Sequence, residues 1–233
     1  MKYSNVFFYF LSCLGILVCY YIYILFFTIH YANFEFDERL SPIAQKNIKL
    51  LAAKYEPYSS YNMQGVLNSI MQAMPCIKSI HAQWLSYGVV HLIIQAHDPI
   101  ISINNQYILL ENESIIARDY YATYLCDRLY NLTICGSVPF SMSSSMVAGL
   151  ERCVSEKLFD HYTFYIANEH EWYLEDKDDP NFTLCCNAAS LPFDTLQAAY
   201  SRLKIKWRKN RIKQAKWNAD IRFEDQIVLS MKK

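Results

Sequence analysis

Residues 62–99 read NMQGVLNSIMQAMPCIKSIHAQWLSYGVVHLIIQAHDP, and the fold prediction starts from this stretch. Apolar side chains recur at helical spacing through its first part, which predicts a short amphipathic helix. Pro75 ends this helix, because proline lacks a backbone donor and disfavours helix in the residue before it. Two runs of alternating apolar and polar residues follow, 80–84 and 90–96, joined by a tight connection that contains Gly88. The stretch therefore predicts a helix followed by a β-hairpin.

The residues before this stretch predict a strand and a second helix. Residues 33–37 fit a short strand. Ser41 followed by Pro42 is typical of a helix N-cap with proline at the first helical position. Apolar residues then form one stripe, so we expect a helix over residues 41–54. The resulting order is strand, helix, helix, strand, strand, with two helices on one face of a three-stranded sheet.

Beyond residue 100 the pattern changes to short strands and turns. It predicts an antiparallel meander, a helix, further strands, a second helix and a last strand. The ranges, in that order, are 101–103, 107–110 and 114–117; 146–158; 162–166, 171–174 and 182–186; 193–211; and 219–231. The predicted fold class is α+β, with an antiparallel β-rich second domain that carries helices.

The chain begins with a long uncharged segment. Residues 6–29 contain no Asp, Glu, Lys or Arg, and as a helix they would exceed the roughly 30 Å hydrocarbon core of a bilayer. A cleaved signal peptide is the alternative, but its apolar region is normally shorter and ends in small residues. We therefore expect a retained transmembrane helix. Lys2 before it favours an inside amino terminus, which places the bulk of the chain outside the cytoplasm.

The first predicted domain resembles a POTRA domain, on its order of elements and on the hairpin that ends in His97, Asp98 and Pro99. Continued into residues 106–115, the series is similar to the bacterial cell-division protein family FtsQ (DivIB in other bacteria). The later residues follow that family more loosely, through a strand led by Trp172 and a closing segment, 218–223, that reads NADIRF. The resemblance implies a cytoplasmic tail and transmembrane helix over residues 1–32, a POTRA domain over 33–100 and an FtsQ-type β domain over 101–233.

This resemblance also implies a function. FtsQ-type proteins are non-catalytic scaffolds of the division machinery in the cell inner membrane, single-pass, with the amino terminus cytoplasmic and the bulk periplasmic at the septum. Their second domain binds small coiled-coil partners, FtsB and FtsL. The expected partners of this chain are therefore FtsB-like and FtsL-like membrane proteins, together with the lipid bilayer through residues 6–29.

The expected partner site is the end of the chain. Residues 220–230 alternate in polarity, with a turn or bulge at Glu224 and Asp225, and we expect residues 226–230 to form an edge strand that accepts a partner strand. The alternative is a central strand that only packs the core. The residues predicted to bind the partner are Asp220, Arg222, Phe223, Gln226, Ile227, Val228, Leu229 and Ser230.

No catalytic motif is present, so we expect no enzyme activity, cofactor or small-molecule substrate. Acidic and basic residues balance at 22 each, so no net positive charge favours binding to nucleic acid.

Histidines near the hairpin, His81 and His91 among them, are expected to be solvated rather than metal ligands. The basic run over residues 204–216 fits a solvated helix face better than a lipid or phosphate site. Six cysteines outside the first segment leave buried thiols and one or two disulfides equally open.

Two other classes of protein fit parts of the pattern. A POTRA-bearing secretion or chaperone component shares the first domain, although such proteins continue into a barrel and the sequence stops at Lys233. A eukaryotic or viral type II membrane glycoprotein would use the acceptor sequons at Asn112, Asn131 and Asn181.

Overall fold

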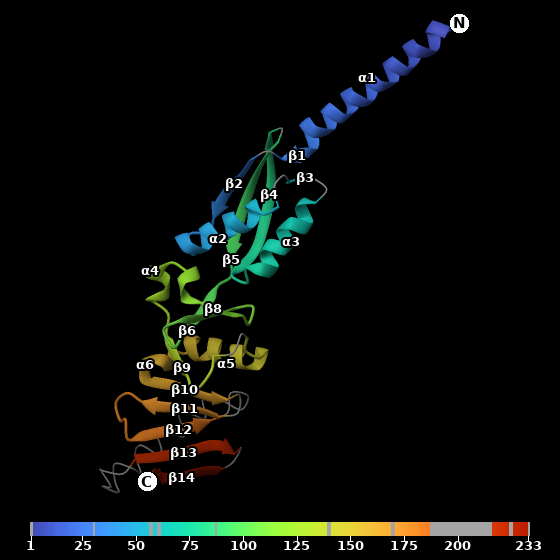
Figure 1. Cartoon of the computed structure of the whole chain (residues 1–233). Coiled ribbons are helices and arrows are strands. Elements are labelled where there is room, and N and C mark those ends of the chain that lie inside the picture. Colours follow the sequence, from blue (N-terminus) through green and yellow to red (C-terminus); the bar gives the residue numbers. More distant parts are fainter. Residues whose placement is uncertain are drawn as a thin grey trace. The chain divides into compact units, whose positions relative to one another are not determined.

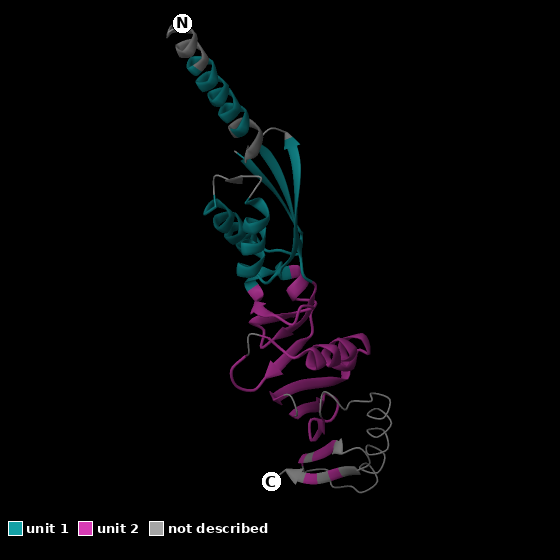
Figure 2. Ribbon diagram, turned by 90° about the vertical axis from the view of Figure 1, so that its right-hand side faces the viewer, with its two compact units in different colours: residues 1–97, 119–123 teal, residues 98–118, 124–233 magenta. Residues whose placement is uncertain are grey.

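The computed structural model describes residues 2–29, 31–55, 58–59, 62–86, 88–138, 141–168, 171–186, 216–223 and 226–232. The chain is a mixed α+β protein (Figure 1). It divides into two compact units (Figure 2). Unit 1 contains Met1–His97 and Asp119–Thr123, and unit 2 contains Asp98–Arg118 and Tyr124–Lys233.

The amino-terminal helix α1 spans Lys2–Phe27. It is followed by β1, Thr28–Ile29, which pairs antiparallel with β3, Tyr58–Ser59. The predicted helical span therefore ends two residues too late, because residues 28 and 29 pair as a strand. Within the described residues, no helix combines the length and apolar character needed to cross a membrane, so the predicted transmembrane helix is not confirmed.

Unit 1 has the predicted β-α-α-β-β order. Its elements are β2, Tyr31–Phe36; α2, Pro42–Ala53; α3, Met63–Ala73; β4, Ile77–Ser86; and β5, Val89–Ala96. The sheet order is β2-β5-β4, in which β2 runs parallel to β5 and β4 runs antiparallel to it. The first strand begins two residues before the predicted range.

Both helices of this unit begin and pack as their sequences dictate. Ser41 caps α2, since its Oγ accepts a hydrogen bond from the Ala44 amide at 3.2 Å and Pro42 follows at the first position. The apolar stripes of α2 and α3 are buried, Ile48 and Ile70 among them. Both helices lie on one side of the sheet (Figure 2). They cover the face that carries Val90, Leu92 and Ile94, which are all buried.

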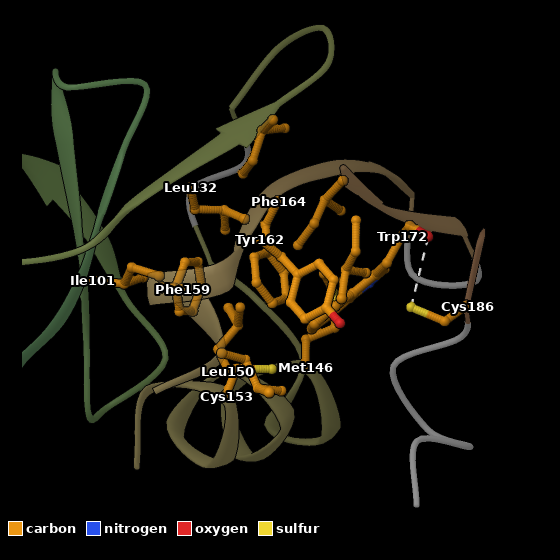
Figure 3. Close-up of a cluster of buried hydrophobic side chains, with 14 of the residues drawn as sticks. Ile101, Leu132, Met146, Leu150, Cys153, Phe159, Tyr162, Phe164, Trp172 and Cys186 are labelled. Atoms are coloured by element: carbon orange, nitrogen blue, oxygen red, sulfur yellow. Dashed lines mark hydrogen bonds between the residues drawn. The ribbon is translucent and has the colours of Figure 1, made fainter. Parts of the chain in front are cut away.

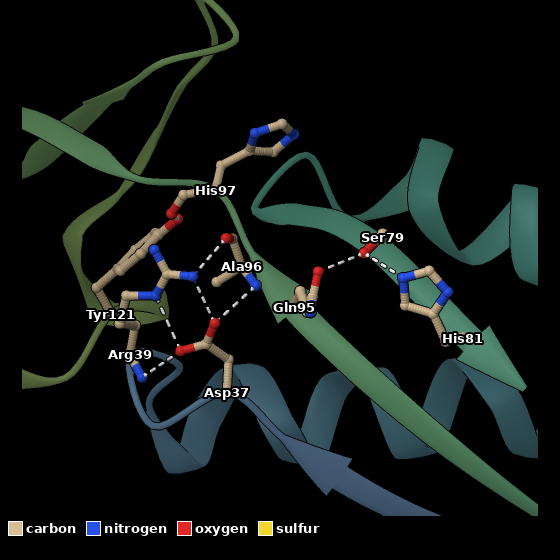
Figure 4. A network of polar contacts seen from close by, with 8 residues as sticks. All are labelled: Asp37, Arg39, Ser79, His81, Gln95, Ala96, His97 and Tyr121. Carbon is tan, nitrogen blue, oxygen red and sulfur yellow. Dashed lines mark hydrogen bonds and ion pairs between the residues drawn. The ribbon is translucent and has the colours of Figure 1, made fainter. Parts of the chain in front are cut away.

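A polar network closes the end of this sheet where β2 stops (Figure 4). Arg39 donates from Nε to Oδ1 of Asp37 at 2.9 Å and from Nη2 to Oδ2 at 2.6 Å. The Ala96 amide donates to the same Oδ2 at 3.1 Å, and Arg39 Nη2 donates to the Ala96 carbonyl at 2.9 Å. The pair therefore ties the residues after β2 to the last residue of β5.

Residues 119–123 also belong to unit 1 and attach beside this network. Leu40 and Tyr121 form an antiparallel bridge, and the Ala122 amide donates to the Arg39 carbonyl at 2.8 Å. The Tyr121 hydroxyl donates to the His97 carbonyl at 2.7 Å. Tyr121 is almost fully buried, so this short segment completes the packing at that end of the unit.

Unit 2 is built on one mixed sheet with the order β14-β13-β12-β11-β10-β9-β6-β7-β8. In chain order its strands are β6, Pro99–Ile103; β7, Tyr107–Leu110; β8, Ile115–Ala117; β9, Asn131–Ile134; β10, Tyr162–Asn168; β11, Glu171–Asp176; β12, Phe182–Cys186; β13, Lys216–Phe223; and β14, Gln226–Lys232. Its longest described helix is α5, Ser144–Ser155, followed by α6, Leu158–His161. Two short helices, the 3-10 helix η1 at Arg118–Tyr120 and α4 at Thr123–Cys126, lie where the chain passes between the units.

Three predictions for this unit are corrected. The sheet is not purely antiparallel, because β9 runs parallel to β6 and β10, and β12 runs parallel to β13. The helix predicted over residues 146–158 is two helices, since Lys157 adopts a left-handed backbone with φ 56° between them. The last strand predicted over residues 219–231 is the antiparallel pair β13 and β14. The predicted helix over residues 193–211 lies outside the described residues.

The core of unit 2 lies between one sheet face and α5 (Figure 3). Phe164, Trp172 and Leu174 come from the sheet and are fully buried, and Leu150 and Cys153 come from α5. The Phe159 ring stacks on Phe164 with centroids 4.1 Å apart. The meander predicted after residue 100 is confirmed as β6, β7 and β8.

The hairpin turn of unit 1 gives a first prediction. Gly88 has φ +71°, a left-handed conformation that costs other residues roughly 1–2 kcal/mol. Gly88→Val should lower the free energy of unfolding by at least about this amount, measured on the full-length chain. The matched control is Gly65→Ala in α3, where an added Cβ meets nothing within 4 Å and should stabilise by about 0.5–1 kcal/mol. Equal stability of the two variants would contradict the turn geometry.

The Asp37 network gives a second prediction. Hydrogen bonds from Arg39 hold the pKa of Asp37 at about 2, below the roughly 3.9 of an unfolded chain. A depressed carboxyl pKa stabilises the fold above the unfolded value, so about 1–2 kcal/mol should be lost as the pH falls from 4 towards 2. Asp37→Asn should remove this part of the pH dependence in acid titrations of unfolding. Asp127→Asn, which breaks a more exposed pair with Arg118, should change much less. An unaltered acid profile for Asp37→Asn would show that the network contributes nothing.

Candidate partner-binding edge

Strand β14 lies at one edge of the nine-stranded sheet, which is where residues 226–230 were expected. It pairs with β13 on one side, through Ala219 opposite Leu229 and Asp220 opposite Val228. No other described strand pairs with its second side. The backbone groups on that side are therefore the donors and acceptors that an added strand would use.

The two faces of the edge differ in burial. Ala219 is fully buried and stands in a cross-strand row with Leu184, Leu174 and Phe164, so this face continues the core of unit 2. On the opposite face the side chain of Val228 is 46% exposed, and Ser230 is also exposed. The strands at this edge therefore have one face that packs in the core and one face with exposed side chains.

The structure places the predicted site residues on two strands. Asp220, Arg222 and Phe223 lie on β13, which is the second strand from the edge, and the other five lie on β14. The register brings Asp220 opposite Val228 and Phe223 opposite Gln226, with a register shift between residues 220 and 223. Of these residues, the side chains of Asp220, Val228 and Ser230 are described. Asp220 is half-buried.

The sheet face that carries Val228 continues over the neighbouring strands. Tyr165, Tyr173 and Cys185 form one cross-strand row that leads to Asp220 and Val228. Val228 is the exposed member of this row, since Cys185 is buried and the two tyrosines and Asp220 are half-buried. Thr183 and Asn218 begin a second row that ends at Ser230. The sequence analysis missed this face, although the alternating burial of β10 and β11 is visible as alternating polarity in their sequences. Burial and the neighbouring carboxylate of Glu175 raise the pKa of Tyr165.

The described residues include no cluster of three or more potential metal-ligating side chains. His91 Nε2 lies 2.9 Å from Glu35 Oε2. Figure 4 shows the second contact, in which His81 Nε2 lies 3.3 Å from Ser79 Oγ, whose hydroxyl donates to Gln95. These contacts lie on the sheet face of unit 1 that the helices leave open. Each of the two imidazoles therefore makes a polar contact with one neighbouring side chain at the surface.

All eight cysteines lie in the described part of the chain, and each is a free thiol. Burial raises the pKa of Cys76 to about 11 and that of Cys153 to about 12. A thiol with so high a pKa stays protonated at neutral pH and is a poor nucleophile. These two residues therefore act as core side chains, which is one of the two readings the sequence left open.

Comparison with known proteins adds no relative: no protein-family model matches the chain, and no curated protein matches it.

The face assignment can be tested by charge placement. Ala219→Lys puts an ammonium group into the buried face and should cost several kcal/mol of unfolding free energy, within the roughly 3–5 kcal/mol of an uncompensated buried charge. Val228→Lys, directly across from Asp220 on the open face, should change the free energy by less than about 0.5 kcal/mol. Thermal unfolding of the two full-length variants measures the difference. Similar losses in both would mean that the two faces are wrongly assigned.

Proposed function

We propose that this protein is a non-catalytic scaffold of the bacterial division machinery, similar to the FtsQ family, that binds partner proteins at the β14 edge. The observation that carries the proposal is an edge strand of seven residues with one open, half-apolar face. Together with a β-α-α-β-β unit and a second β-rich unit, it fits the order of parts that the family resemblance implies.

Strand addition is the proposed mode of binding. A partner segment that pairs with β14 extends the sheet by one strand, and its backbone hydrogen bonds each contribute about 0.5–1.5 kcal/mol. The alternate side chains set specificity, because those on one face meet Val228 and Ser230. The proposed partners are FtsB-like and FtsL-like coiled-coil membrane proteins.

A bilayer contact through residues 6–29 is the second part of the proposal. The described side chains of α1, residues 9–23, include many large apolar groups that are exposed, such as Phe10, Ile16 and Leu17. No charged residue interrupts this segment, so water is a poor environment for it. A lipid contact at the inner membrane removes these side chains from water. The family resemblance, rather than this lipid contact, places the amino terminus in the cytoplasm and the rest of the chain in the periplasm at the septum.

The test uses two neighbouring proline variants of the full-length chain. In an antiparallel strand, consecutive residues direct their backbone amides to opposite sides, so one of Val228 and Leu229 donates to β13 and the other faces the free side. Val228→Pro and Leu229→Pro should therefore differ. One should lower the melting temperature of the chain, and the other should keep it while it removes one donor from the free edge.

Co-purification from the native host then measures how much of the partner proteins each variant binds. The proline variant that keeps the melting temperature should recover at least about fivefold less of the coiled-coil partners, which corresponds to about 1 kcal/mol. Gly65→Ala serves as the matched control, because it lies in α3 of unit 1 and leaves β14 unchanged. Full recovery of the partners by both proline variants would rule out strand addition at β14.

A further inference from the structure

Large apolar side chains are exposed at one end of the three-stranded sheet of unit 1. Tyr31 is 72% exposed, Trp84 is 50% exposed and Leu85 is 58% exposed. They come from the start of β2 and the end of β4, which are far apart in the sequence. We call these three residues the apolar sheet end.

The strand register brings the three residues to the same end. Tyr31 is opposite Val89 and Trp84 is opposite Val90, on the two sides of β5. The Tyr31 amide also donates to the Gly88 carbonyl in the hairpin turn at 3.1 Å. Since neighbouring strands lie about 4.8 Å apart, the backbones of Tyr31 and Trp84 are separated by only about 10 Å.

The covalent chain holds the apolar sheet end close to the uncharged segment 6–29. Tyr31 is the second residue after Ile29, and two residues of extended chain reach at most about 7 Å. Residues 28 and 29 themselves pair with β3 of the same unit. Since residues 28 and 29 belong to the folded unit, a bilayer contact of the segment ends at or before Phe27, the last residue of α1. Four residues of chain, at most about 14 Å, separate Phe27 from Tyr31 of the apolar sheet end.

The chemistry of this sheet end suits the interface of a bilayer. Residues 79–97 contain no Asp, Glu, Lys or Arg, and neither do residues 31–34. Tryptophan and tyrosine favour the headgroup region, because their rings are apolar with one polar atom. The nearest carboxylate on β2 is Glu35, which is already paired with His91.

We propose that the apolar sheet end inserts into the headgroup region of the bilayer that residues 6–29 contact. It is a second membrane contact, made by a folded domain rather than by the helix, and it fixes the orientation of the three-stranded sheet against the membrane surface. The inference rests on the proposed bilayer contact of residues 6–29, and the experiment below separates the two.

The experiment measures tryptophan quenching in the full-length chain reconstituted into phosphatidylcholine vesicles, with and without a spin label on the lipid headgroup. Subtracting the signal of Trp84→Phe isolates Trp84 from the other three tryptophans. The matched control is Ile43→Trp in the Trp84→Phe background. Ile43 is 54% exposed and lies in the first turn of α2, which begins at the opposite end of the sheet from the hairpin turn. Flotation of each variant with the vesicles reports the bilayer contact of residues 6–29.

We expect every variant to float, and the headgroup label to reduce the Trp84 emission at least about twofold more than that of the Ile43→Trp control. If the chain floats and Trp84 is quenched no more than the control, the sheet end does not meet the lipid and this inference is overturned, while the bilayer contact of residues 6–29 stands. Shielding of Trp84 only after partner proteins are added would overturn it in favour of a protein surface. If the chain does not float at all, both proposals are overturned.

Discussion

Parallel strand pairing is the constraint on which both units depend. A parallel pair cannot be joined by a tight turn, so each one needs a long crossover that returns the chain to the same end of the sheet. In unit 1 the chain between the parallel strands β2 and β5 supplies α2, α3 and β4. In unit 2 the chain between β9 and β10 supplies α5 and α6. These helices therefore lie in the crossovers that connect parallel strands. Their apolar faces cover the sheet that the strand pairing forms.

The same pairing decides which strands are left at the edges. The sheet of unit 2 ends at β8 and at β14. The first is only three residues long, which is a common way to protect an edge, whereas the second is seven residues long and carries an exposed Val228. An edge of that length with an apolar side chain on its open face is a hazard for aggregation unless another chain covers it. This contrast between the two edges, rather than any single residue, is the physical basis of the proposal that a partner binds at β14.

Local patterns in the sequence predicted the β-α-α-β-β order of unit 1, but not its β1–β3 pair, and they predicted unit 2 only in part. The Ser41 cap, the end of α3 just before Pro75 and the positive φ of Gly88 each follow from the chemistry of one or two residues. The direction of β9 against β10 depends on contacts between distant residues, and no local pattern contains it. The hairpin of β13 and β14 was predicted only in part, as one strand over residues 219–231 with a turn or bulge at Glu224 and Asp225. Three polar residues, 224–226, interrupt the alternation there, but the connection contains no glycine, proline or asparagine that would define a tight turn. Among the described strands, residues 226–230 lie on the edge strand as expected, and Asp220, Arg222 and Phe223 lie on the neighbouring strand β13. Partner binding at these residues stays a prediction.

We interpret the exposed apolar side chains differently at the β4 edge and at the β14 edge. β4 is also an edge strand in the described sheet, and Trp84 and Leu85 near its end raise the question of a second site for strand addition. Its pairing with β5 is irregular, with register shifts at residues 77–79 and at residues 84–86, and Lys78 stands near its start. Bulges and an edge lysine both disfavour the approach of another strand. The exposed apolar groups of β4 also gather at its last residues rather than along its length, next to Tyr31 of another strand. A sheet end with exposed apolar side chains, on strand segments 31–34 and 79–97 that carry no charged residue, fits a lipid interface, whereas a long open edge such as β14 fits a strand.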